Sequence, residues 1–134
     1  MKIIKIFKSS SNYNKKWIGV DLDGTLAEYD KWMGPEHIGE PIEKMKQRVE
    51  SWINEGKNVK ILTARVANAH GEREAKECRK HIRNWLVEVF GEIGEEIEIT
   101  CEKDQDMDQL WDDRAISVEK NTGELKILRE EDFN

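Results

Sequence analysis

The sequence lacks several features that mark specialised classes of protein. It has no apolar run close to the roughly 20 residues that a membrane helix needs. Residues 1–7 are partly apolar, but they are too few for the core of a signal peptide. The two cysteines, Cys78 and Cys101, are too few for a disulfide framework or a zinc site built from thiolates. We therefore expect a cytoplasmic protein with no membrane partner, in which both cysteines are reduced and lie in the core.

Basic residues are also few relative to acidic ones. There are 22 Lys and Arg against 28 Asp and Glu, which gives a net charge of -6. This balance argues against a general nucleic-acid binder, because such proteins carry a basic face. The acid is concentrated in residues 95–113, which hold nine acidic residues and one lysine. Composition alone leaves open whether this stretch is a solvated surface or a cation site.

The 134 residues fit one domain, spanning 1–134, with no internal repeat, low-complexity tract or linker. Apolar runs and alternation predict strands over 1–7, 17–20, 58–62 and 97–101, and a further strand leading into Trp111. Apolar residues at helical spacing predict helices over 41–56 and 72–90, each stopped by a glycine. Trp52 and Trp85 lie on these apolar stripes and are expected in the core.

Two further segments complete this outline. Residues 27–40 have no clear period and predict a loop that forms a short flap. Residues 115–119 and 124–128 predict a C-terminal β-hairpin around Asn121-Thr122-Gly123. Strands that alternate with helices predict an α/β domain with a mostly parallel central sheet and flanking helices.

Polar, chemically reactive residues follow each predicted central strand. They are Asp21 and Asp23 after the first strand, Thr63 and Arg65 after the second, Lys103 after the third, and Asp112-Asp113 after the fourth. In open α/β sheets, ligands bind beyond the carboxyl ends of the strands. We therefore expect these side chains to form one site.

This set of residue types suits phosphoryl transfer. A carboxylate can attack phosphorus and form an aspartyl-phosphate. A divalent cation in an oxygen-rich site screens the like charges of the carboxylate and the phosphate. A lysine stabilises the anionic transition state, and a second carboxylic acid protonates the leaving oxygen. The sequence has a candidate for each role.

The same residues carry a family resemblance. Asp21-Leu22-Asp23-Gly24-Thr25 after an apolar strand resembles the first motif of the haloacid-dehalogenase-like (HAD) hydrolase superfamily. Ile61-Leu62-Thr63 resembles the second motif, Lys103 the third, and Trp111-Asp112-Asp113 the fourth. These motifs occur in the family's order and span most of the chain. The resemblance implies a single Rossmann-like HAD domain and a hydrolase that depends on Mg²⁺.

The resemblance also implies roles for individual residues. Asp21 would be the nucleophile and a metal ligand. Asp23 would be the general acid and base, with its backbone carbonyl on the metal. Thr63 would bind the phosphoryl group, and Lys103 would steady the nucleophile and the transferring phosphate. Asp112 and Asp113 would complete the Mg²⁺ site, and the sequence does not tell which of the two ligates the metal directly.

Asp23 favours phosphatase over dehalogenase chemistry, because a halide leaving group needs no proton. Thr63-Ala64-Arg65, Asp112-Asp113-Arg114 and the short flap resemble the small, nearly capless members of the polynucleotide-phosphatase-like type. The resemblance thus implies a phosphomonoester hydrolase with an open site. The short gap between Lys103 and Asp112 departs from the family pattern, because it leaves little room for a crossover helix.

Several alternatives stay open. The substrate would be a small phosphorylated molecule, a nucleotide or a nucleic-acid end bearing a 3′-phosphate, and the oligomeric state is not determined. A module that binds phosphate or nucleotide without catalysis is the competing class. Ala64, Arg65 and Arg114 are candidate substrate contacts, although either arginine could instead form structural ion pairs. Tyr29, Trp32 and His37 in the flap would either contact a substrate ring or pack against the body.

Overall fold

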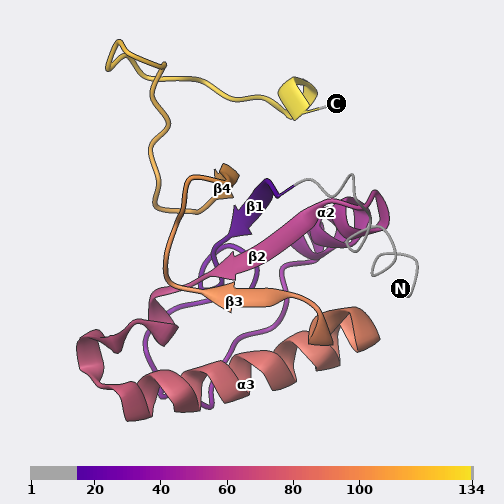
Figure 1. Ribbon diagram of the computed structural model, residues 1–134, viewed down its shortest axis with the longest axis vertical. Coiled ribbons are helices and arrows are strands. Elements are labelled where there is room, and N and C mark those ends of the chain that lie inside the picture. Colours follow the sequence, from indigo (N-terminus) through magenta and orange to yellow (C-terminus); the bar gives the residue numbers. More distant parts are fainter. Residues whose placement is uncertain (1–14, 134) are drawn as a thin grey trace.

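The computed structural model describes residues 15–133, so the strand predicted over 1–7 lies outside the described residues. The sheet has strands β1 (Trp17–Val20), β2 (Asn58–Leu62), β3 (Glu98–Thr100) and β4 (Met107–Trp111). These strands are all parallel and lie in the order β3-β2-β1-β4. Helices α2 (Glu43–Asn54) and α3 (Glu72–Phe90) flank the sheet (Figure 1). The α/β class and the parallel sheet are confirmed.

Both long helices bury the apolar stripe that their spacing predicts. In α2 the buried residues are Met45, Val49 and Ile53. In α3 they are Ala75, Cys78, Ile82, Trp85, Leu86 and Phe90. Gly56 follows α2 with a φ of 82°, a conformation that favours glycine, and so ends the helix where the sequence predicts. The start of α2 differs, since the helix begins at Glu43, two residues after Pro41.

Short 3₁₀ turns connect or follow these elements. They are η1 (Ala64–Val66), η2 (Asn68–His70), η3 (Gly91–Glu95) and η4 (Glu130–Phe133). The first two join β2 to α3, and the third joins α3 to β3. Every residue of β1 is buried, because this strand lies between β2 and β4. A buried central strand gives its carboxyl end a fixed position, and this is where Asp21 follows.

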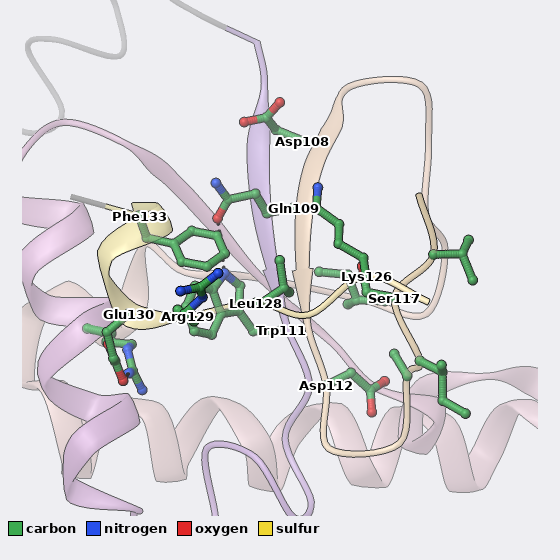
Figure 2. A pocket seen from close by; sticks show the side chains of 15 residues that line it. Asp108, Gln109, Trp111, Asp112, Ser117, Lys126, Leu128, Arg129, Glu130 and Phe133 are labelled. Carbon is green, nitrogen blue, oxygen red and sulfur yellow. Dashed lines mark hydrogen bonds and ion pairs between the residues drawn. The ribbon is translucent and has the colours of Figure 1, made fainter. Parts of the chain in front are cut away.

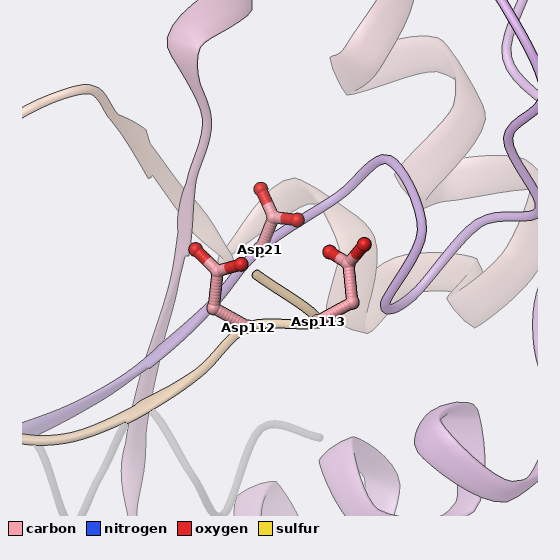
Figure 3. Close-up of side chains that lie close together, drawn as sticks. All are labelled: Asp21, Asp112 and Asp113. Carbon is pink, nitrogen blue, oxygen red and sulfur yellow. The ribbon is translucent and has the colours of Figure 1, made fainter. Parts of the chain in front are cut away.

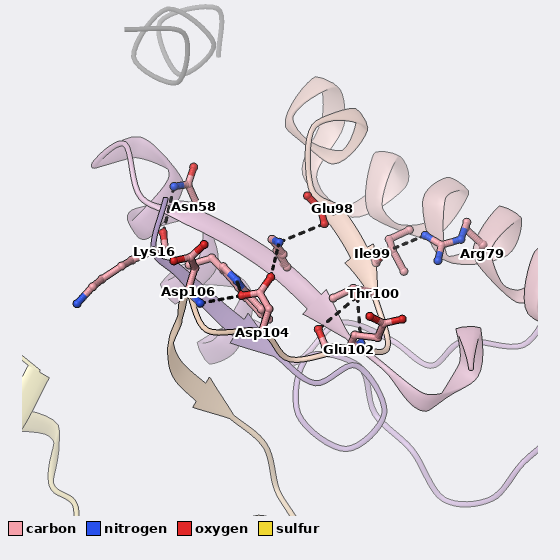
Figure 4. Close-up of polar contacts among 11 residues, drawn as sticks. Lys16, Asn58, Arg79, Glu98, Ile99, Thr100, Glu102, Asp104 and Asp106 are labelled. Carbon is pink, nitrogen blue, oxygen red and sulfur yellow. Dashed lines mark hydrogen bonds and ion pairs between the residues drawn. The ribbon is translucent and has the colours of Figure 1, made fainter. Parts of the chain in front are cut away.

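The connection from β3 to β4 crosses the sheet without a helix. Residues 101–106 pass from one edge strand to the other, over β2 and β1. The path covers three strand spacings, about 14 Å, and returns by about 13 Å from the carboxyl edge to the amino edge of the parallel strands. The resulting distance of about 19 Å is within reach of a six-residue extended segment of about 20 Å. Asp104 holds the crossing in place by accepting a 2.8 Å hydrogen bond from Trp17 Nε1. It also forms a 3.9 Å ion pair with Lys60 (Figure 4).

The predicted C-terminal hairpin strands are wrong. Residues 115–119 and 124–128 form an antiparallel turn with one isolated bridge, between Val118 and Leu125. The turn itself is as predicted, since Asn121 and Gly123 have φ values of 67° and 78°. Ile116 and Ile127 are 77% and 82% exposed, so no sheet face covers them. Two paired strands without a face to bury are marginal, and this explains the short pairing.

The chain then returns to the body at η4. The Phe133 ring lies 5.1 Å from the Trp111 ring, which in turn lies 5.2 Å from Trp52 of α2. Arg48 of α2 donates a 2.5 Å hydrogen bond to Glu130. These contacts attach the end of the chain to β4 and α2. Trp52 is only partly buried, although it is predicted in the core, whereas Trp85 is buried as predicted.

The two cysteines differ in burial. Cys78 is buried in the core, as expected, but Cys101 is exposed and the prediction for it is wrong. The reason is that β3 ends at Thr100, so Cys101 begins the exposed crossing loop. In residues 15–133, neither long helix has an apolar stretch that could cross a membrane.

Candidate functional site

Three carboxylates meet at the carboxyl edge of the sheet. Asp21 directly follows β1, and Asp112 and Asp113 directly follow β4. The two strands are parallel neighbours, and Asp21 N donates a 2.9 Å hydrogen bond to the carbonyl of Trp111. One oxygen from each carboxylate lies within 4.8 Å of the others (Figure 3). The structure therefore brings Asp21, Asp112 and Asp113 together, as the sequence predicts.

Thr25 links the two halves of this cluster. Its hydroxyl lies 3.1 Å from Asp113 Oδ1 and 3.4 Å from Asp21 Oδ2, and it accepts a 2.9 Å hydrogen bond from Asp113 N. Its single proton can serve only one carboxylate at a time. Thr25 is 9% exposed, so this link is shielded from water. Sequence reasoning gave Thr25 no role, although it stands in the first motif.

Gly24 permits the close approach of Asp113. Its φ is 90°, and a Cβ at this position would lie 2.6 Å from Asp113 Oδ2. Such a contact would force the Asp113 carboxylate to move, and the φ by itself favours glycine. The signal for this was present in the sequence as Asp23-Gly24-Thr25, but only the fold shows what the glycine faces.

The electrostatics of the cluster follow from this crowding of acids. Burial is the largest cause that raises the pKa of Asp21, and the charge of Asp112 is the next. A hydrogen bond to Asp113 and the charges of Asp113 and Asp23 also raise it, to about 7 from a usual value of 3.8. Carboxylates that disfavour one another's charge are stabilised by a cation between them.

The donor set fits a hard divalent cation. All three groups offer carboxylate oxygens, which are the ligands that Mg²⁺ prefers. Ligands at about 2.1 Å from Mg²⁺ lie about 3 to 4 Å from one another in an octahedron. The mutual limit of 4.8 Å found for Asp21, Asp112 and Asp113 is close to that range. A small movement of the side chains would therefore close the cluster around one ion.

Asp23 lies beside this cluster in a bidentate ion pair. Arg65 Nε donates to Asp23 Oδ2 at 2.7 Å, and Arg65 Nη2 donates to Asp23 Oδ1 at 2.9 Å. The same Nη2 donates to the carbonyl of His37 in the flap at 3.0 Å. The first and second predicted motifs thus meet through the ion pair between Asp23 and Arg65. Arg65 is a partner of Asp23 in this arrangement.

Thr63 lies at the carboxyl end of β2 and is buried. Its backbone N donates a 2.9 Å hydrogen bond to the carbonyl of Thr100 on the neighbouring edge strand. Its hydroxyl accepts from Arg65 N at 3.2 Å and so caps η1. Ala64, the first residue of η1, is exposed. Thr63 therefore orients the backbone of Arg65, while its predicted contact with phosphate stays a prediction.

In residues 15–133, the side chains of Lys103 and Arg114 form no hydrogen bond or ion pair with the three carboxylates. Lys103 is exposed in the crossing loop, next to Asp104, which contacts Trp17 at the opposite end of β1 from Asp21. Among residues 15–133, no hydrogen bond or ion pair is found between Lys103 and the cluster. Arg114 is exposed, and its backbone N donates to Asp112 Oδ1 at 2.8 Å. The roles predicted for both side chains remain predictions.

A cavity of about 900 Å³ adjoins the cluster at Asp112. It lies between β4 and the C-terminal segment, and Asp112 is the carboxylate that belongs to both the cavity and the cluster (Figure 2). Trp111, Leu128 and Phe133 provide much of its apolar wall. Sequence reasoning did not anticipate this cavity, because it depends on how the C-terminal segment folds back.

Comparisons with known proteins give no independent assignment. No protein-family model matches the chain, and neither a curated protein nor a solved structure matches it. The resemblance to the HAD superfamily therefore stays a prediction made from the motifs.

Proposed function

We propose that the protein is a Mg²⁺-dependent phosphomonoester hydrolase of the HAD type that acts through an aspartyl-phosphate at Asp21. The observation that carries the proposal is the position of Asp21, Asp112 and Asp113 within 4.8 Å of one another at the carboxyl edge of a parallel sheet. Asp23 lies two residues beyond Asp21 and supplies the second carboxyl group that this chemistry needs.

In this proposal the chain's own residues divide the work. Asp21, Asp112 and Asp113 would hold the ion, which when bound would screen the carboxylates from the substrate phosphate. An oxygen of Asp21 attacks phosphorus, and the ester P–O bond breaks as the leaving oxygen takes a proton from Asp23. Water then attacks the aspartyl-phosphate and gives a proton to Asp23. Inorganic phosphate leaves, and both carboxyl groups return to their first state.

The ion pair between Arg65 and Asp23 sets a condition on these steps. Protonation of Asp23 would weaken the hydrogen bonds that it accepts from Arg65 at 2.7 and 2.9 Å, because a carboxylic acid is a poorer acceptor than a carboxylate. Release of at least one oxygen by Arg65 would therefore help Asp23 to act as an acid. A substrate phosphate is a suitable acceptor for the released N–H groups, because guanidinium binds phosphate with paired hydrogen bonds.

The test is hydrolysis of a generic aryl phosphate by the purified chain, with Mg²⁺ and after chelation. We expect turnover only with Mg²⁺, and a loss of at least about a thousandfold in kcat for Asp21→Asn. The matched control is Asp108→Asn, which removes an exposed carboxylate on β4 outside the cluster and is expected to keep activity. Undiminished turnover by Asp21→Asn would show that Asp21 is not the nucleophile.

A second candidate is a module that binds phosphate without catalysis. The observation in its favour is the same ion pair, because it engages both oxygens of Asp23. A panel of nucleotides, sugar phosphates and oligonucleotides with a 3′-phosphate separates the two. Mg²⁺-dependent binding without hydrolysis of any of these would favour the module. Faster turnover of the oligonucleotide than of the mononucleotide would indicate a nucleic-acid end as the substrate.

A further inference from the structure

The flap holds an aromatic ring that stays largely exposed. Of the five tryptophans, all within residues 15–133, only Trp32 is exposed, with 47% of its surface open. The others are buried or packed against neighbouring rings. Tyr29, three residues earlier, is 48% exposed. Of the two readings left open for these side chains, packing of the flap against the body leaves their exposed surface unexplained.

Contacts with Arg65 hold Trp32 close to the carboxylates. The guanidinium carbon of Arg65 lies 4.8 Å from the centre of the Trp32 ring, a cation–π distance. The same guanidinium binds both oxygens of Asp23. Trp32 is therefore one side chain away from Asp23 and lies at the margin of the proposed active site.

Contacts hold the two ends of the flap together, so Trp32 lies on an ordered segment. Glu28 N donates a 2.8 Å hydrogen bond to the carbonyl of Glu40. Gly39 lies so close to Glu28 that a Cβ would be 2.1 Å from its carbonyl oxygen. Trp85 Nε1 on α3 donates to the carbonyl of Gly39 at 3.0 Å. A preorganised binding face loses less entropy when a ligand binds.

Arg65 also has an unused hydrogen-bond donor. Its side chain is 5% exposed, and among the described residues its Nη1 has no acceptor. A buried donor without an acceptor is costly, and a ligand with acceptor oxygens would remove that cost. The exposed ring of Trp32 and the unused Nη1 donor of Arg65 therefore lie on two side chains that contact each other.

We propose that Trp32 determines substrate specificity by stacking on a planar ring of the substrate while the phosphate occupies the site at Asp21. The substrate class is then a phosphate ester that carries an aromatic or heteroaromatic ring, such as a nucleoside phosphate. Rings stack on tryptophan through their π-faces, so any base serves. This inference rests on the proposed phosphatase function and specifies the substrate of the same site.

The test measures binding in the presence of Mg²⁺ by calorimetry, with phenylphosphonate and cyclohexylphosphonate as probes. Both have a P–C bond and similar apolar size, but only one has a planar ring. We expect phenylphosphonate to bind about tenfold more tightly to the wild-type chain, as for stacking of one ring. Trp32→Ala should remove this ratio, and Trp32→Phe should keep part of it. Met33→Ala, which changes the neighbouring exposed flap residue, should leave the ratio unchanged.

Equal affinity for the two probes in the wild type, no binding of either, or an unchanged ratio in Trp32→Ala would overturn the inference. Hydrolysis of the aryl phosphate tests the reaction separately. Preference for phenylphosphonate without any hydrolysis would support the ring site and contradict the proposed reaction. Hydrolysis without that preference would support the reaction and contradict the ring site. Affinity for a mononucleotide and for an oligonucleotide with a 3′-phosphate then identifies the source of the ring.

Discussion

At the scale of single residues, the carboxylate cluster depends on the absence of a side chain at Gly24. Gly24 turns the chain with a φ of 90° so that Thr25 reaches both Asp21 and Asp113. The space that a side chain would take is filled by the Asp113 carboxylate. Residues that orient metal ligands typically change metal affinity by about 10- to 100-fold when they are altered.

We therefore expect Gly24→Ala to weaken Mg²⁺ binding by about tenfold. Gly56→Ala is the matched control, because Gly56 has a φ of 82° but a Cβ there would meet nothing within 4 Å. Both variants should lose about 1 kcal/mol of stability from backbone strain. Titration of Mg²⁺ by calorimetry, with unfolding in urea, separates the effects. Equal Mg²⁺ affinity for the two variants would contradict the role given to Gly24.

At the scale of elements, helical periodicity predicted the burial of most stripe residues correctly, although Trp52 is only partly buried, and strand alternation was correct only in part. The spacing in 72–90 gave a helix whose bounds are those of α3, because its apolar stripe packs on the sheet. The alternation in 115–128 gave no strands, because nothing covers the exposed side chains there. An apolar pattern alone does not tell whether a face is available for packing.

Two isoleucines test this difference between the elements. Ile82 of α3 is 0% exposed, whereas Ile127 of the C-terminal segment is 82% exposed. Ile82→Ala should lower the free energy of unfolding by about 2 to 5 kcal/mol, because it removes buried contacts and leaves a cavity. Ile127→Ala should change it by less than about 0.5 kcal/mol. Urea unfolding of both variants measures this, and a large loss for Ile127→Ala would mean that the segment is covered in solution.

At the scale of the whole molecule, part of the negative charge is concentrated at one edge of the sheet. The net charge is -6, and the sheet brings three of the carboxylates to one edge. Burial and neighbouring charges hold the pKa of Asp21 at about 7 against 3.8 in its usual environment. Because this pKa is raised by folding, ionisation of Asp21 opposes the folded state. The stability that protonated Asp21 provides is complete below pH 3.8 and is lost as the pH rises through about 7.

Without Mg²⁺, the Asp21→Asn chain should therefore be more stable than the wild type at pH 8, and the difference should shrink toward pH 4. Addition of Mg²⁺ at pH 8 should stabilise the wild type more than Asp21→Asn, because the ion offsets the repulsion. Thermal unfolding with and without a chelator measures both effects. Asp108→Asn, which lies outside the cluster, should differ from the wild type in stability by the same amount at pH 4 and at pH 8. A wild type that stays more stable than Asp21→Asn at pH 8 would contradict the electrostatic account.

The sequence by itself determined the α/β class, the helix stripes and the reactive residues that follow Val20, Leu62 and Trp111. These properties depend on local periodicity and on the rule that parallel strands end at one edge. Only the tertiary structure decided that Arg65 binds Asp23, that Thr25 joins Asp21 to Asp113, and that Trp32 stays exposed. It also placed Lys103 in the crossing loop, where in residues 15–133 its side chain forms no hydrogen bond or ion pair with Asp21, Asp112 or Asp113. Such contacts join residues distant in sequence, so they depend on strand order and loop path, which no local pattern encodes.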